Sequence, residues 1–158
     1  MTSLDLAYAA GLIDGEGTIG ISELQPNDKC RKNGTRVRKS PQHRIYVAIT
    51  MTDQVAIAWM QLTFGGHFQS LSPRQPQHKP TYRWSLASKA AAEFCETIAP
   101  YLKVKRQQAE IVARFYQERM AHNFQGNSGV PVDELSLRRQ VMAKIKILNQ
   151  RGVAIGGK

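Results

Sequence analysis

Two carboxylates stand among glycines near the start of this 158-residue chain, in the segment Asp14-Gly15-Glu16-Gly17. Small and apolar residues before them predict a helix over 4–14, and the alternation after them predicts a strand over 17–25. The two acids would thus lie at the C-terminal end of a helix, where the helix dipole disfavours negative charge by roughly 0.3–1 kcal/mol. Something else in the molecule must therefore balance the charge of this segment.

The composition of the chain points to a polyanionic partner. Lys and Arg number 22 against 12 Asp and Glu, a formal net charge of +10, and the 42% hydrophobic content fits a globular protein. Nucleic acid is the first candidate partner and an anionic membrane surface the second. We expect one domain over 1–150 and a flexible, Gly-rich tail over 151–158.

Several classes of protein fit the sequence poorly. No apolar run approaches the roughly 18 residues of a membrane span, and no signal peptide is apparent, so we expect an intracellular protein of unknown compartment, with no membrane partner. Cys30 and Cys95 have no zinc or disulfide spacing and are expected to be free thiols. The four histidines are scattered and form no zinc motif; His67 and His78 are expected in turns, with contact to DNA as the alternative.

Hydrophobic periodicity and capping residues predict an α+β fold. Helices are expected over 4–14 (capped by Ser3), from Thr52 or Asp53 to 64, from Ser88 to 99, over 105–120 and over 133–150; strands are expected over 17–25, 43–51, 67–72 and 81–86. The resulting order, αββαββα plus C-terminal helices, places helices on one face of a twisted antiparallel sheet. The last helix has Leu137, Val141, Ile145 and Leu148 on one stripe.

The other face of this sheet is predicted to bind DNA. Residues 29–44 hold seven Lys and Arg and no acid, which favours a phosphate-contacting arm over the alternative of a solvated loop. A twisted antiparallel sheet can enter the major groove, where each base pair is distinguishable. The candidate DNA-binding residues are Ser22, Lys29, Arg31, Lys32, Arg36, Arg38, Lys39, Arg44, Tyr46, Thr50, Gln69, Arg74, Arg83 and Ser85.

The segment AGLIDGEG, residues 10–17, resembles the motif that names the LAGLIDADG homing endonucleases. Glu16 stands where the family name has aspartate, and Gly15 where it has alanine. The predicted αββαββα order is that family's fold, and PYLKVKRQQAE, residues 100–110, resembles the segment before a later helix in its single-motif members. The resemblance therefore covers most of the chain.

The resemblance implies roles for particular residues. Glu16 would bind Mg²⁺ with help from the Gly15 carbonyl; Mn²⁺ would substitute, and Ca²⁺ would bind without supporting cleavage. Lys105 would stabilise charge near the scissile phosphate, and Asp53 would either organise water or cap a helix. Asp14 would be mainly structural, bonding across an interface.

A single motif per chain predicts a homodimer, because one carboxylate is too few to hold a metal cluster. Two motif helices would pack through small residues and Asp14, although packing inside one monomer is the alternative. The candidate interface residues are Ala7, Ala10, Gly11, Asp14 and Gly15.

The predicted function is that of a sequence-specific homing endonuclease, without a small-molecule substrate. It would make a double-strand break in a long, near-palindromic DNA site by Mg²⁺-dependent phosphodiester hydrolysis and so promote intron mobility. A catalytically inactive relative, acting as an RNA-splicing maturase or a DNA-binding regulator, is the alternative. A ribosomal or other RNA-binding protein would fit the charge but leave Asp14 and Glu16 unexplained.

Overall fold

The computed structural model describes residues 1–26, 40–73, 75, 77–120 and 129–150. Four antiparallel strands form one sheet in the order β1-β2-β4-β3. The strands are β1 (Gly17–Leu24), β2 (Gln42–Met51), β3 (His67–Leu71) and β4 (Thr81–Ala87). The helices are α1 (Ser3–Glu16), α2 (Gln54–Phe64), α3 (Ser88–Ile98), α4 (Arg106–Phe115) and α5 (Val132–Leu148).

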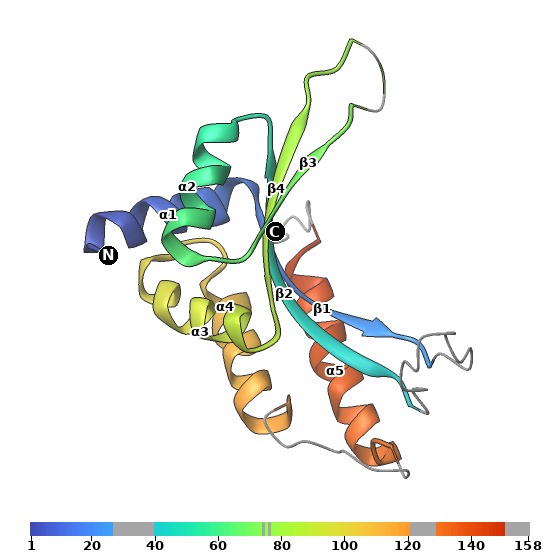
Figure 1. Cartoon of the computed structure of the whole chain (residues 1–158). Coiled ribbons are helices and arrows are strands. Elements are labelled where there is room, and N and C mark those ends of the chain that lie inside the picture. Colours follow the sequence, from blue (N-terminus) through green and yellow to red (C-terminus); the bar gives the residue numbers. More distant parts are fainter. Residues whose placement is uncertain (27–39, 74, 76, 121–128, 151–158) are drawn as a thin grey trace, which may run out of the picture.

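The predicted α+β class and αββαββα order are confirmed. In Figure 1, α1 to α4 lie on one side of the sheet, α5 runs beside β1, and β3 and β4 project beyond the helices. A 3₁₀ turn, Ala99–Tyr101, follows α3, and a π-helical turn, Tyr116–Met120, extends α4. No helix in the described part of the chain is long and apolar enough to span a membrane.

The start and end of α1 differ from the prediction. Thr2, not Ser3, is the N-cap: its hydroxyl accepts the Asp5 N–H at 3.2 Å, and the Asp5 carboxylate accepts the Thr2 N–H at 2.7 Å, a reciprocal capping box. The helix continues through Gly15 to Glu16 rather than ending near residue 14. Both acids of the motif therefore lie in the last turn of α1.

Two other helix starts show which capping predictions were right. Of the two candidate caps of α2, Asp53 is the one used, since its Oδ1 accepts the Ala56 N–H at 2.9 Å. The prediction that Ser88 caps α3 was wrong: Ser88 is the first residue of that helix and has φ of +52°, while Ala87 occupies the cap position without a side-chain bond. Local sequence did not distinguish Asp53, which caps its helix, from Ser88, which does not.

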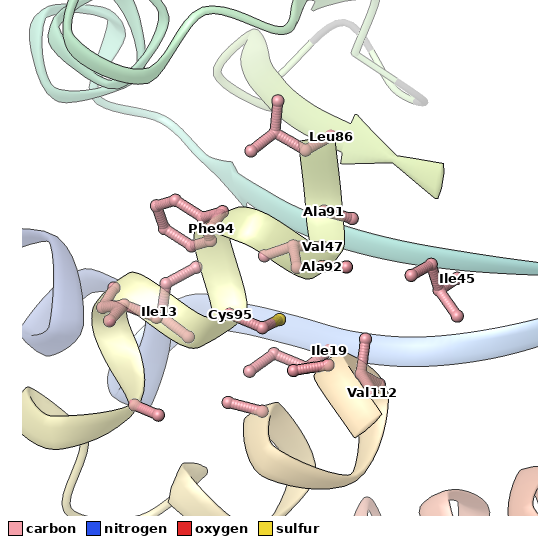
Figure 2. Close-up of a cluster of buried hydrophobic side chains, with 14 of the residues drawn as sticks. Ile13, Ile19, Ile45, Val47, Leu86, Ala91, Ala92, Phe94, Cys95 and Val112 are labelled. Carbon is pink, nitrogen blue, oxygen red and sulfur yellow. The ribbon is translucent and has the colours of Figure 1, made fainter. Parts of the chain in front are cut away.

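The hydrophobic core lies between the sheet and the helices. Figure 2 shows Ile13 of α1, Val47 of β2, Phe94 and Cys95 of α3 and Val112 of α4 within one cluster. The alternation predicted for β2 is confirmed, because Ile45, Val47 and Ile49 are fully buried. Cys95 is a free thiol, and burial raises its pKa to about 12.

Helix α5 covers the edge strand β1, but its predicted apolar stripe was partly wrong. Leu137 is 41% exposed, whereas Arg138 is buried and pairs with Glu134 at 2.8 Å. Arg139 of α5 pairs with Glu23 of β1 at 2.8 Å. Asn149, just after α5, donates its side-chain N–H to the Ile19 carbonyl at 2.9 Å. These contacts cover an edge whose backbone groups would otherwise face solvent.

His43 is the buried polar side chain that fits this core least well. It lies opposite Glu23 in the β1–β2 register, with its Nε2 3.3 Å from the Glu23 carboxylate, yet neither ring nitrogen has a hydrogen-bond partner. Burial lowers the pKa of His43 below its ordinary value of 6.5; Glu23 and Glu134 oppose the shift, while Arg138 and Arg139 reinforce it. The neutral imidazole is therefore the form that the fold favours.

We expect the His43→Phe variant to lose less stability on acidification than the wild type. The unfolded chain protonates its histidine first as the pH falls below about 6.5, so the folded state loses stability from that pH downwards. Glu23, whose pKa is lowered mainly by its bond to Arg139, loses its contribution only below 4.5. Urea unfolding at pH 7.5 and 5.5 measures the difference, with His67→Phe, an exposed position, as the control; equal losses in the wild type and His43→Phe would contradict it.

Candidate active site

The last turn of α1 and the start of α4 hold each other through what we call the Asp14–Lys105 clasp. The Asp14 carboxylate accepts the backbone N–H groups of Lys103 at 2.7 Å, Val104 at 3.2 Å and Lys105 at 2.9 Å. In return, the Lys105 ammonium donates to the carbonyls of Ile13 at 2.8 Å and Asp14 at 2.6 Å. The clasp balances the charge of Asp14, one of the two acids that appeared misplaced in the sequence.

The clasp places each charged group at a favourable helix end. Asp14 lies in the last turn of α1, but its carboxylate lies against the N–H groups that lead into α4, where negative charge is favoured. Lys105 is the N-cap residue of α4, but its ammonium donates to carbonyls in the last turn of α1, where positive charge is favoured. The resemblance placed Asp14 in bonds across an interface; the structure instead gives its carboxylate three partners within the chain.

Glu16, two residues beyond Asp14, is exposed and borders the polar face of the sheet. It lines a hollow of about 240 Å³ together with Thr18, Tyr46, Ala48, Thr50 and Arg83. Three of the predicted DNA-binding residues thus lie beside the predicted metal ligand. The two motif acids have separate environments, one in the clasp and one at the open face.

The strand register places the remaining described DNA-binding candidates on this same face. Thr50 lies opposite Arg83, which lies opposite Gln69; Ser22 lies opposite Arg44. Gly20 lies opposite Tyr46, and a Cβ at Gly20 would be 2.7 Å from the Tyr46 ring, so only glycine lets this ring lie across β1. We call this surface the open face: Thr18, Gly20, Ser22, Arg44, Tyr46, Ala48, Thr50, His67, Gln69, Arg83 and Ser85.

Thr18 and His67 belong to the open face, although Thr18 was not among the predicted binding residues and contact to DNA was only the alternative for His67. Thr18 lies on the same face of β1 as Ser22, so the alternation of the strand could have identified it. His67 was expected beside a turn, where the predicted strand 67–72 begins; it is the first residue of β3 and lies opposite Ser85. The predicted binding residues Lys29, Arg31, Lys32, Arg36, Arg38, Lys39 and Arg74 lie outside the described residues, as do the tail 151–158, Cys30 and His122.

A second pocket, of about 420 Å³, adjoins the clasp. Lys105 and Gln108 line it from the α4 side, and Leu148, Asn149 and Gln150 line it from the end of α5. The buried side chain of Gln108 donates to the Leu148 carbonyl at 3.3 Å and so fastens this wall. Nothing local in the sequence marked Gln108 or Asn149, because their partners are far away along the chain.

The oxygen donors at the end of α1 suit a hard divalent cation. Glu16 supplies an exposed carboxylate, and the Gly15 carbonyl is among the last four of α1, which lack partners within the helix. Within the residues that the structure describes, no group of three or more His, Cys, Asp or Glu is close enough to hold a metal ion. Asp53 caps α2, and its predicted catalytic role stays a prediction.

The outer face of α1 carries small residues flanked by exposed apolar ones. Gly11 and Gly15 have open space where a Cβ would stand, and Leu4 and Tyr8 are 80% and 50% exposed. The Tyr8 ring also contacts the Trp59 ring of α2, with centroids 4.8 Å apart. Ala7 is exposed, but Ala10 is only 2% exposed and packs in the core of its own chain, which corrects its place in the predicted interface.

Comparison with known proteins finds matches to the fold but none to the sequence. No family model and no curated protein matches the sequence, but solved structures match the fold. The homing endonuclease I-CvuI, in complex with the I-CreI target, has a TM-score of 0.69 and 18% identity, with 98% of this chain and 85% of that chain covered. The archaeal intron-encoded homing endonuclease I-Vdi141I, complexed with DNA, has a TM-score of 0.67 and 14% identity, with 98% of this chain and 89% of that chain covered.

A longer neighbour completes the comparison. The LAGLIDADG homing endonuclease I-LtrWI, bound to target DNA, has a TM-score of 0.60 and 16% identity, with 91% of this chain but 45% of that chain covered. The chain therefore has the homing endonuclease fold, and the resemblance seen in AGLIDGEG is confirmed at the level of the fold.

We expect Asp14→Ala to destabilise the protein by about 2–3 kcal/mol, because three backbone N–H groups lose a charged acceptor. Asp14→Asn, which keeps one acceptor oxygen but no charge, should lie between this variant and the wild type. Urea unfolding at pH 7 measures both. Glu110→Ala is the control, since its exposed pair with Arg106 should contribute less than about 0.5 kcal/mol; a loss for Asp14→Ala no larger than this would contradict the role of the clasp.

Proposed function

We propose that this chain is a single-motif LAGLIDADG homing endonuclease. It acts as a homodimer that makes a double-strand break in a long, near-palindromic DNA site by Mg²⁺-dependent phosphodiester hydrolysis, and so promotes intron mobility. The observation that carries this proposal is the hollow that Glu16 lines together with Tyr46, Thr50 and Arg83 of the open face. A metal-binding carboxylate and a DNA-binding surface would then share one border.

The open face supplies the DNA-binding half of the proposal. Arg44 and Arg83 are exposed there, among hydroxyl and amide side chains that can contact base edges or phosphates. Such a twisted antiparallel sheet can lie in the major groove. The fold neighbours I-CvuI and I-Vdi141I are both homing endonucleases in complex with DNA, which supports the same partner here.

The end of α1 supplies the catalytic half. Glu16 and the Gly15 carbonyl would hold Mg²⁺, with Mn²⁺ as a substitute and Ca²⁺ binding without cleavage. When bound, such an ion polarises the phosphodiester and lowers the pKa of the attacking water. Lys105, held on two carbonyls by the clasp, would place a fixed positive charge near the developing negative charge. Asp53 would orient water from the start of α2.

A second copy of the chain would complete this site. One described chain offers one exposed motif carboxylate, whereas a twofold axis along the outer face of α1 would bring two copies of Glu16 together. Ala7, Gly11 and Gly15 leave space there for a second helix, and Leu4 and Tyr8 would be buried by it. Because this chain covers 45% of I-LtrWI, that longer chain has room for two such units.

We expect Glu16→Gln to reduce DNA cleavage by at least about 100-fold while leaving DNA binding within a few-fold of the wild type. The loss follows because the amide keeps the size of the side chain but removes the charge that would hold the metal. The assay is linearisation, with Mg²⁺, of a plasmid that carries the joined exons flanking the host intron. Glu93→Gln, at an exposed ion pair on α3, is the control and should cut normally.

Tight, specific binding without cleavage in Mg²⁺ or Mn²⁺ would overturn the nuclease proposal. That outcome would favour the alternative of a catalytically inactive relative, a maturase or DNA-binding regulator, whose open face needs no metal.

We expect Gly11→Leu to convert the dimer into a folded monomer. The Cβ meets nothing within 4 Å in the single chain, and leucine is the better helix former by about 0.8 kcal/mol, so the monomer fold should be kept. The larger side chain would, however, hold two α1 helices apart. Light scattering and circular dichroism measure both effects, with Ala143→Leu on the exposed side of α5 as the control; a wild-type protein that is monomeric alone and on DNA would refute the homodimer.

A further inference from the structure

Helix α5 is anchored less firmly than the other helices of the fold. Of its 17 residues, two are buried, Arg138 and Ile145, whereas α4 buries five of 10 and α3 buries five of 11. Figure 1 shows α5 beside the edge strand β1. Segments with little buried apolar surface are the first to open in a folded protein. The polar contacts that tie α5 to the sheet therefore matter for keeping it docked.

One carboxylate joins α5 to the sheet and to a buried histidine. Both oxygens of Glu23 accept hydrogen bonds from Arg139 of α5, at 2.8 and 3.2 Å. The same carboxylate lies 3.3 Å from Nε2 of His43, the residue opposite Glu23 on β2. The imidazole is fully buried, and neither of its ring nitrogens has a hydrogen-bond partner. A protonated His43 would therefore compete with Arg139 for Glu23.

The surroundings of His43 offer an added proton no other partner. The charged groups that act on it are Glu23 from β1 and Glu134, Arg138 and Arg139 from α5, and the Phe115 ring of α4 lies at a centroid distance of 6.4 Å. Glu134 is already paired with Arg138 and with Arg119. A buried charge is costly unless it is paired and hydrogen-bonded. An imidazolium in this position must therefore either take Glu23 from Arg139 or reach water.

We propose that His43 and Glu23 form an acid-sensitive latch for α5. When the imidazole takes up one proton from solvent, Glu23 turns to it and Arg139 is released. Helix α5 then separates from β1 and admits water to the imidazolium, while α1 to α4 and the sheet stay folded. The latch closes again when the proton returns to solvent.

Release of α5 reaches the candidate active site through the last residues of the helix. Gln108 of α4 donates to the Leu148 carbonyl, and Asn149 donates to the Ile19 carbonyl of β1. Leu148 and Asn149 form one wall of the pocket beside Lys105. When α5 separates, this wall leaves the pocket, so acidification weakens the support of the candidate active site. This consequence rests on the proposed function, whereas the latch itself does not.

The sign of the pH effect follows from the burial of His43. Burial lowers the pKa of His43 below its ordinary value of 6.5 while α5 is docked. The undocked state therefore takes up the proton first, so docking is strongest above about pH 6.5 and weakens below it. Between pH 7.5 and 5.5, one such proton shifts the docking equilibrium by at most about 10-fold.

The test is hydrogen exchange of backbone amides at pH 7.5 and 5.5, corrected for the intrinsic effect of pH on exchange and read by mass spectrometry. In the wild type, α5 amides should exchange about 3- to 10-fold faster at pH 5.5, while α3 amides keep their rate. His43→Gln should remove this difference, with His43→Phe as a second neutral variant. His78→Gln, at an exposed position, is the control and should match the wild type.

A variant of the partner side chain tests the same contact at constant pH. Arg139→Gln, at a side chain that is 53% exposed, should keep the fold and speed α5 exchange at both pH values. Unchanged α5 exchange in this variant would overturn the latch, whatever the His43 variants do.

The inference also fails if α5 exchange in the wild type is the same at both pH values, or rises equally in the wild type and the neutral variants. Equal acceleration of α3 and α5 would overturn it as well, because it indicates loss of the whole fold rather than release of one helix. An acid-released α5 in a protein that never cuts DNA would leave the latch standing and refute the proposed nuclease. Normal cutting with a pH-independent α5 would do the opposite.

Discussion

The position of the candidate site depends on the exchange of charges between the end of α1 and the start of α4. Asp14 and Lys105 are neighbours only in space, since 91 positions separate them along the chain. Five hydrogen bonds join the two segments, and each charge lies at the helix end whose dipole favours it. Because β1 begins directly after Glu16, the clasp fixes both the last turn of α1 and the entry to the sheet.

The alternation of β1 and β2 then separates stability from recognition. Ile19, Val47 and Ile49 fill the core on the helix side, while the residues between them form the open face. A substitution on the open face changes what the sheet can contact without removing buried apolar surface, whereas the core side has no such freedom. Gly20 is the exception on the open face, because the Tyr46 ring occupies the place of its missing side chain.

The features that the sequence predicted well are those with a local signal. The strict alternation of β2 and the glycines after Phe64 need only a few consecutive residues to be recognised. The errors and omissions came from partners far away in the chain or from a choice between adjacent residues. Arg138 is buried because its guanidinium pairs with Glu134 and donates to the Arg119 carbonyl. Thr2 rather than Ser3 caps α1 because Asp5, three residues after Thr2, completes a capping box with it. The motif identified Glu16, but only the fold showed that Asp14 faces α4.

The distribution of charge explains why one carboxylate at the border of the open face is unusual. Two other acids of the described chain pair with arginines outside the open face: Glu23 pairs with Arg139, and Glu134 pairs with Arg119 and Arg138. Within the described strands the open face carries Arg44 and Arg83 and no acid, so Glu16 is the carboxylate that would meet DNA phosphates there. A bare carboxylate in that place repels the phosphates, and a divalent cation between them turns the repulsion into attraction. Given the proposed DNA partner, this charge pattern is a second argument, beside the resemblance of the motif, for the proposed metal binding at Glu16.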